Sequence, residues 1–183
     1  MTSGETTRAS DGGASDDPAF NDRAFHDTVL RSYRSLARLA FLMSGDPVTA
    51  EDMVAEAFAR AWIPWKKGTV DKLEPYVRRT VVNLCLQGKR RRLLDWRRGQ
   101  RLLAEGEPMT HTMGDQATDH IDLLRGLNAL SVDHRAVIVL RFYADLSERE
   151  TAEVLRLPVG TVKSRTTRAL KALRPLMERT ADE

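Results

Sequence analysis

The stretch SERETAEVLRLPVGTVKSRTTRAL, residues 147–170, predicts two helices joined by a tight turn. Ser147 and Glu150 have the spacing of a capping box, in which each side chain satisfies an orphan backbone N–H at a helix start. Pro158 ends the first helix, because the residue before a proline avoids the helical conformation. In the second helix, small or apolar residues recur at three-and-four spacing. They are Val162, Thr166, Ala169, Leu170 and Leu173.

The other face of the second predicted helix is basic, and residues 161–174 contain no acid. The hydrogen-bond donors on this face can bind phosphates and the edges of guanine bases. This favours a helix-turn-helix whose second helix lies in the major groove. The alternative is a solvated basic surface. Arg156 departs from the pattern, because it stands at the turn position where such motifs often place glycine.

Length and composition support small hydrophobic cores: the chain has 183 residues, of which 42% are hydrophobic, and a net charge of +3. No segment reaches the ~20 apolar residues of a membrane span, and the N-terminus lacks a signal-peptide pattern, so we expect a cytoplasmic protein. Cys85, the single cysteine, is expected in the core rather than in a redox switch. The four histidines have neither metal-ligand nor nucleophile spacing, so we expect no metal, cofactor or enzymatic activity.

The chain divides into two predicted helical domains. Residues 1–22, rich in Gly, Ser, Thr and Asp, predict a disordered acidic tail. Residues 23–99 predict a three-helix bundle whose second helix is capped by Asp46 and begins with Pro47. Residues 100–118 lack periodicity and predict a flexible linker, residues 119–177 form a second helical domain with the helix-turn-helix, and residues 178–183 are a C-terminal tail. The predicted class is all-α.

Three sequence blocks in this order resemble the extracytoplasmic-function (group IV) sigma factors of bacterial RNA polymerase. They are SGDPVTAEDMVAEAFARAW (44–62), YVRRTVVNLCLQGKRRR (76–92) and VIVLRFYADLSERETAEVLRLPVGTVKSRTTRALKAL (137–173), similar to family regions 2.1–2.2, 2.3–2.4 and 4. Ala55 departs from the family, which often has glutamine there. The resemblance implies a subunit that binds core polymerase and promoter DNA and does no covalent chemistry.

The resemblance also implies roles for residues of the first domain. Asp52 and Glu56 would dock on the β′ coiled coil of core polymerase, where acids suit a basic partner, although from spacing alone they could equally solvate a helix face. Asn83 would contact the minus-10 element rather than serve as a core amide. The cluster Lys89, Arg90, Arg91 and Arg92 would grip the promoter backbone. The loop 66–74 would cradle a flipped base, while the nearby aromatic residues Trp62, Trp65 and Tyr76 are either stacking platforms or, as we expect for Trp62, core.

The second domain would bind the β flap and read the minus-35 element. Its predicted contacts are Thr161, Lys163, Ser164, Arg165, Thr167, Arg168 and Lys171. The resemblance leaves an anti-sigma factor open as a further partner. The rival hypothesis is a stand-alone helix-turn-helix regulator, which would commonly bind palindromes as a symmetric dimer.

Overall fold

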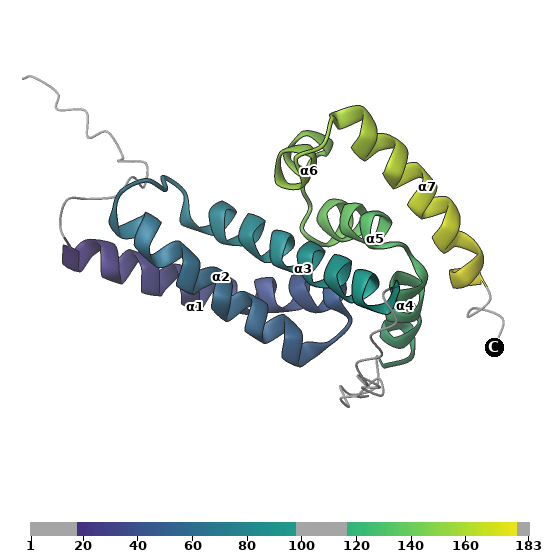
Figure 1. Ribbon diagram of the computed structural model, residues 1–183, viewed down its shortest axis with the longest axis horizontal. Coiled ribbons are helices and arrows are strands. Elements are labelled where there is room, and N and C mark those ends of the chain that lie inside the picture. Colours follow the sequence, from purple (N-terminus) through teal and green to yellow (C-terminus); the bar gives the residue numbers. More distant parts are fainter. Residues whose placement is uncertain (1–17, 98–116, 179–183) are drawn as a thin grey trace, which may run out of the picture.

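The computed structural model describes residues 18–97 and 117–178, and every regular element in these ranges is a helix (Figure 1). The first range forms α1 (Pro18–Ser44), α2 (Pro47–Lys66) and α3 (Leu73–Arg97). The second forms α4 (Ala117–Ala129), α5 (Val132–Ile138), the π-helical turn η1 (Val139–Tyr143), α6 (Glu148–Leu155) and α7 (Val159–Glu178). The all-α prediction is confirmed. The predicted N-terminal tail, linker and C-terminal tail lie largely outside the described residues.

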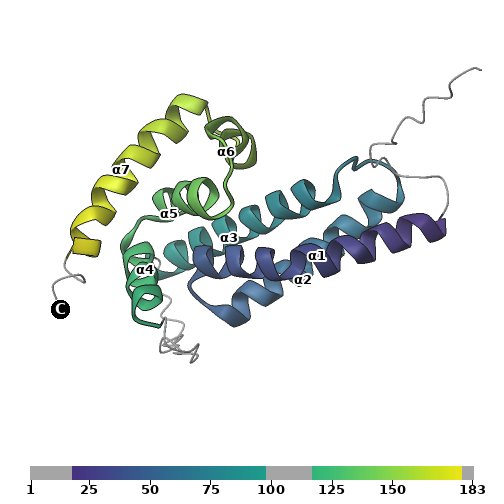
Figure 2. The same cartoon turned by 180° about the vertical axis from the view of Figure 1, so that it is seen from behind.

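Helices α1, α2 and α3 lie side by side and form the first bundle (Figure 1, Figure 2). Each helix turns an apolar stripe toward the other two, and the small and β-branched side chains of these stripes are fully shielded from water. Ala40, Val54, Ala57, Val77 and Val81 are each 0% exposed. Burying each valine contributes roughly 1.5–3 kcal/mol relative to leaving it in water, so this stripe is the main source of the bundle's stability.

The start of α2 follows the predicted pattern. Asp46 is the N-cap, its Oδ2 accepts a hydrogen bond from the Thr49 backbone N–H at 2.8 Å, and Pro47 is the first helical residue. The helix continues through Pro64 to Lys66, since a proline in the last turn removes only one of its backbone hydrogen bonds.

The start of α1 differs from the prediction. The helix begins at Pro18, whereas the sequence placed a disordered tail as far as residue 22. Two contacts with the end of α2 hold this first turn: the Trp65 indole N–H donates to the Asn21 carbonyl at 3.0 Å, and Lys66 pairs with Asp22 at 3.2 Å. Both partners are more than forty positions away in the chain, so local composition carried no sign of them.

Helices α4 to α7 form the second bundle, in which α7 packs mainly against α5 and α6. Val162 and Ala169 on α7 are 0% exposed, as the predicted stripe requires. Leu170 was assigned to that stripe incorrectly, because it is 44% exposed. It follows Ala169 by one residue, and this step of 100° turns it away from α5.

The two bundles are in contact, and we call this contact the seam. It is formed by the C-terminal half of α1 and by α3 on one side, and by α5, η1 and α6 on the other (Figure 1). The hydrogen bonds that cross it include one from Arg135 Nη1 to the Met43 carbonyl at 3.4 Å and one from the Tyr143 hydroxyl to the Ser35 carbonyl at 3.3 Å. One cluster of buried apolar residues runs continuously through both bundles. The two predicted domains are therefore packed together.

Candidate nucleic-acid and polymerase interfaces

The helix-turn-helix begins with the predicted capping box. The Ser147 backbone N–H donates to Glu150 Oε2 at 2.7 Å, and the Glu150 N–H donates to Ser147 Oγ at 3.2 Å. Hydrogen bonding with the Ser147 side chain, and secondarily with its backbone, lowers the pKa of the Glu150 carboxyl. The first turn of α6 is therefore fixed by interactions that lie within four residues.

The turn between α6 and α7 accommodates Arg156 in the left-handed conformation, with φ of 54°. Its N–H and that of Leu157 bond back to the carbonyls of Glu153 and Ala152 at 3.4 and 2.9 Å. A glycine at the end of the helix would give the same geometry. Arg156 therefore forms the usual turn, although such motifs often place glycine at this position.

Helix α7 presents most of its predicted DNA-binding residues to solvent. Lys163, Ser164, Thr167, Arg168 and Lys171 are all exposed. Two of them are bonded to their own helix, since Ser164 donates to the Thr161 carbonyl and Thr167 to the Lys163 carbonyl, each at 3.1 Å. These five residues thus set three long cationic side chains among hydroxyl groups.

Two of the predicted minus-35 residues lie off this face. Thr161 is half-buried in the first turn of α7. Arg165 is half-buried as well and pairs with Asp133 of α5 at 3.1 Å. The guanidinium of Arg165 therefore ties α7 to α5, and its predicted contact with DNA stays a prediction.

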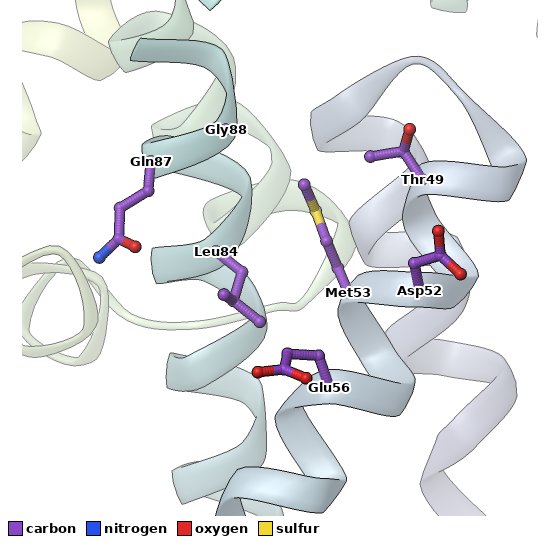
Figure 3. Close-up of a pocket in the computed structure, with 7 residues that line it drawn as sticks. All are labelled: Thr49, Asp52, Met53, Glu56, Leu84, Gln87 and Gly88. Atoms are coloured by element: carbon purple, nitrogen blue, oxygen red, sulfur yellow. The ribbon is translucent and has the colours of Figure 1, made fainter. Parts of the chain in front are cut away.

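Asp52 and Glu56 are exposed on α2 and border a pocket of about 410 Å³ between α2 and α3 (Figure 3). Glu56 is also paired with Arg60 at 2.6 Å. Sequence reasoning missed the other wall of this pocket, which is lined by Leu84, Gln87 and Gly88 of α3. The signal was present in the spacing of Leu84 and Gly88, four residues apart and so on one helix face.

Met53 forms the apolar floor of this pocket and points from α2 toward α3 (Figure 3). Its sulfur lies 3.3 Å from Sγ of Cys85, which is buried as predicted for a core cysteine. A Cβ on Gly88 would approach the Met53 methyl group to 3.1 Å, so the glycine leaves room for this side chain. The pocket combines an apolar floor with two exposed carboxylates.

The predicted minus-10 residues all lie on α3. Asn83 is half-buried, and no side-chain hydrogen bond joins it to the described residues. Lys89, Arg90, Arg91 and Arg92 follow on the same helix, and their side chains lie outside the described residues.

The loop 66–74, predicted to cradle a flipped base, borders a wide pocket of about 680 Å³. Its far wall is the start of α1, with Arg23 and Arg31 among its lining residues, a contribution that the sequence did not indicate. Trp65 is buried, whereas the half-buried Trp62 packs edge-on against Phe25 at 4.8 Å between ring centroids. The two tryptophans therefore pack against α1 rather than standing free as stacking platforms.

Within the described ranges, no group of three or more His, Cys, Asp and Glu side chains is placed to hold a metal ion. In the same ranges, no helix has the length and apolar character that crossing a bilayer requires.

Two family descriptions match this chain. Residues 28–97 match sigma-70 region 2, and residues 120–173 match sigma-70 region 4. The chain is 35% identical over 136 residues to the RNA polymerase sigma-E factor of Streptomyces antibioticus, covering 73% of each chain. It is 34% identical over 153 residues to the sigma-E factor of Streptomyces coelicolor, covering 81% of this chain and 78% of that one. A more distant relative is the ECF RNA polymerase sigma factor SigW of Bacillus subtilis, 30% identical over 149 residues and covering 75% of this chain and 80% of that one.

Two solved structures have a similar fold. The sigma factor RpoE from Bartonella quintana, solved with the anti-sigma factor NepR, superposes with a TM-score of 0.68 at 24% identity, over 85% of this chain and 98% of that chain. CnrH, solved with the cytosolic domain of CnrY, superposes with a TM-score of 0.63 at 26% identity, over 88% of this chain and 92% of that chain.

Proposed function

The chain belongs to the sigma-70 family as an extracytoplasmic-function sigma factor of bacterial RNA polymerase, and from this premise we propose how its surfaces divide the work of promoter recognition. A sigma factor binds core polymerase and directs it to promoters, and it is not itself an enzyme. The match covers both a region 2 domain and a region 4 domain. Each domain then has its own surface for DNA or polymerase.

The exposed face of α7 reads the minus-35 element. What supports this assignment is the cluster of Lys163, Arg168 and Lys171 on one exposed face with no acid between them. Arg168 has the bidentate fork that guanine O6 and N7 accept, whereas the lysines act as point charges toward phosphates. Thr161 and Arg165, which are half-buried beside this face, complete the assigned set. The second domain also contacts the β flap.

Helix α3 and the loop before it bind the minus-10 element. The half-buried amide of Asn83 has no hydrogen-bond partner among the described residues, so it is available to a base. The sequence places Lys89, Arg90, Arg91 and Arg92 directly after it, where they would neutralise phosphates. The loop 66–74 and its pocket hold an unpaired base.

Asp52 and Glu56 dock the first domain on the β′ coiled coil of core polymerase. Their carboxylates border a pocket with an apolar floor, a combination that suits a basic helix carrying an apolar side chain. The docked complex works in the cytoplasm with the polymerase. CnrH was solved with the cytosolic domain of CnrY, and by analogy we propose a protein partner, such as an anti-sigma factor, for this chain.

The double variant Asp52→Asn, Glu56→Gln tests the docking surface. We expect weaker binding to purified core polymerase and less promoter-dependent transcription, with unchanged helical content by circular dichroism because both side chains are exposed. Glu51→Gln is the matched control, since it removes an exposed acid on the same helix that does not line the pocket. Equal losses in the control and the double variant would move the docking surface elsewhere.

The whole assignment is tested by transcription from a cognate promoter with core polymerase and this chain. We expect transcripts only when both are present. Tight binding of the chain alone to a palindrome, as a dimer, would instead support the rival stand-alone regulator.

A further inference from the structure

The first turn of α7 presents a nonpolar surface to solvent. Val159, the first residue of the helix, is 45% exposed, and its neighbours Pro158 and Gly160 are exposed as well. Three exposed nonpolar residues in a row add nothing to a hydrophobic core, so they indicate a contact with another molecule. None of the three belongs to the set assigned above to the minus-35 element.

The fold does not require a glycine at position 160. The φ angle of Gly160 is not positive, and a Cβ added there would meet no heavy atom within 4 Å beyond its own turn, among the residues that the structure describes. A glycine in a helix is destabilising relative to alanine, because it loses more conformational freedom on folding. The use that remains for a glycine here is the close approach of another molecule to the helix backbone.

The nonpolar surface lies on the side of α7 that is assigned to DNA. Val159 precedes Lys163 by four residues, so the two side chains are neighbours on one face of the helix. Gly160 precedes Ser164 by the same step. In helix-turn-helix proteins, the N-terminal residues of the second helix are the ones that contact base edges. Val159 and Gly160 are therefore placed where bases are read.

The surroundings favour an anionic partner that carries an apolar group. Residues 154–177 contain no acid, and the exposed cations Arg156 and Lys163 flank the nonpolar surface. In the major groove of DNA, thymine is distinguished by its C5 methyl group, which small apolar side chains contact. A valine can pack against this methyl group without leaving any polar atom unpaired. The chemistry of the first turn thus fits a thymine between phosphates.

We propose that Val159 reads a thymine of the minus-35 element through its C5 methyl group, and that Gly160 allows the first turn of α7 to lie close to the DNA. This inference rests on the proposed reading of the minus-35 element by α7. It adds a contact that depends on shape to the hydrogen bonds assigned to Arg168.

Exchange of thymine for deoxyuridine removes only the C5 methyl group and so tests this contact directly. Each thymine on either strand of a cognate minus-35 element is exchanged in turn, and binding by holoenzyme that contains the full chain is measured. We expect one exchange to weaken binding about two- to fourfold, the factor that burial of one methyl-sized group represents. In Val159→Ala, which removes both γ-methyl groups, the same exchange should have little effect. Equal sensitivity of this variant and the unchanged chain would overturn the contact.

Leu170→Ala is the matched control for Val159→Ala. Leu170 is 44% exposed and projects from nearly the same side of α7, but it lies about 16 Å further along the helix axis. The thymine preference should be the same in this variant as in the unchanged chain. Loss of the preference in both variants would show a general effect on α7 and would overturn the assignment to Val159.

Gly160→Ala separates a contact with DNA from a role in folding. Because a Cβ has room in the free chain and alanine favours a helix, the midpoint of urea unfolding should stay constant or rise. Binding of holoenzyme to the minus-35 duplex should nevertheless fall severalfold, since the added methyl group keeps the helix from the DNA. Unchanged binding, or a lower unfolding midpoint, would overturn the role of Gly160.

The same measurements distinguish this inference from the proposed function. If Arg168→Ala weakens promoter binding while no deoxyuridine exchange does, the assignment of α7 to the minus-35 element stands and the Val159 contact is wrong. If neither Arg168→Ala nor any exchange within the element weakens binding, the proposed reading of this element by α7 is wrong as well.

Discussion

The helix-turn-helix of α6 and α7 and the seam between the two bundles are stabilised in opposite ways. In the helix-turn-helix, the partners that set its geometry lie a few residues apart, as in the pairs Ser147 with Glu150 and Leu157 with Ala152. In the seam, the partners are about a hundred residues apart, and the buried Nε of Arg135 has no partner among the described residues. The DNA-reading unit is therefore fixed by local bonds, whereas its position relative to α1–α3 depends on contacts between residues far apart in the chain.

The first prediction concerns whether the second domain has a hydrophobic core that is independent of the seam. Leu140 in η1 is 0% exposed, so Leu140→Ala should lower the free energy of unfolding of the second domain by about 2–5 kcal/mol. We expect α1–α3 to keep its own melting transition in calorimetry, because its three helices bury a stripe of fully buried residues against one another. Leu30→Ala, at a side chain 66% exposed on α1, is the control and should change little. A single cooperative transition that falls for the whole chain would show that the seam is as strong as the bundle cores.

The second prediction asks whether the reading face works independently of the seam. Arg168→Ala should cost about 1–3 kcal/mol of promoter binding and relax preference at one guanine of the minus-35 element. Lys171→Ala should weaken binding of all sequences alike and lower the salt slope by about one. The measurement is holoenzyme binding to single-base minus-35 variants at several salt concentrations. An equal loss for every variant would remove Arg168 from the base-reading role.

The third and smallest effect is local to the turn. Arg156 adopts a left-handed conformation that costs a non-glycine residue about 1 kcal/mol, so Arg156→Gly should stabilise the second domain by up to that amount in urea unfolding. Arg149→Gly, in the first turn of α6, should instead destabilise it by up to about 1 kcal/mol. The two substitutions should therefore change the free energy of unfolding in opposite directions. A loss of stability in both variants would mean that the Arg156 side chain contributes more than its backbone costs.

The sequence was sufficient wherever a structural feature depends on neighbouring residues. The capping box of Ser147 and Glu150 and the Asp46 cap were both predicted, because their spacing alone specifies them. The buried stripe of α7 was predicted apart from Leu170, which follows a buried alanine by one residue and so turns outward.

What the sequence could not show depends on distant partners. The early start of α1 requires Trp65, and the pocket beside Asp52 and Glu56 requires α3. The sequence did not distinguish Arg165 from the other cations of α7, because its pairing with Asp133 is a contact with another helix. A periodic pattern predicts which face of a helix is buried, but not which helix covers it.

The π-helical turn η1 has a consequence for how this chain can change in evolution. Its extra residue per turn closes a bond from the Ala144 N–H to the Val139 carbonyl at 3.0 Å, where a regular α-helix would bond residues four apart. Deleting one codon within 139–143 would restore ordinary α-helical spacing, and because the same turn would then be closed with one residue fewer, the segment that follows would keep nearly its present orientation. A single in-frame deletion in η1 would thus be accommodated without altering any residue of the capping box or the DNA-reading helix.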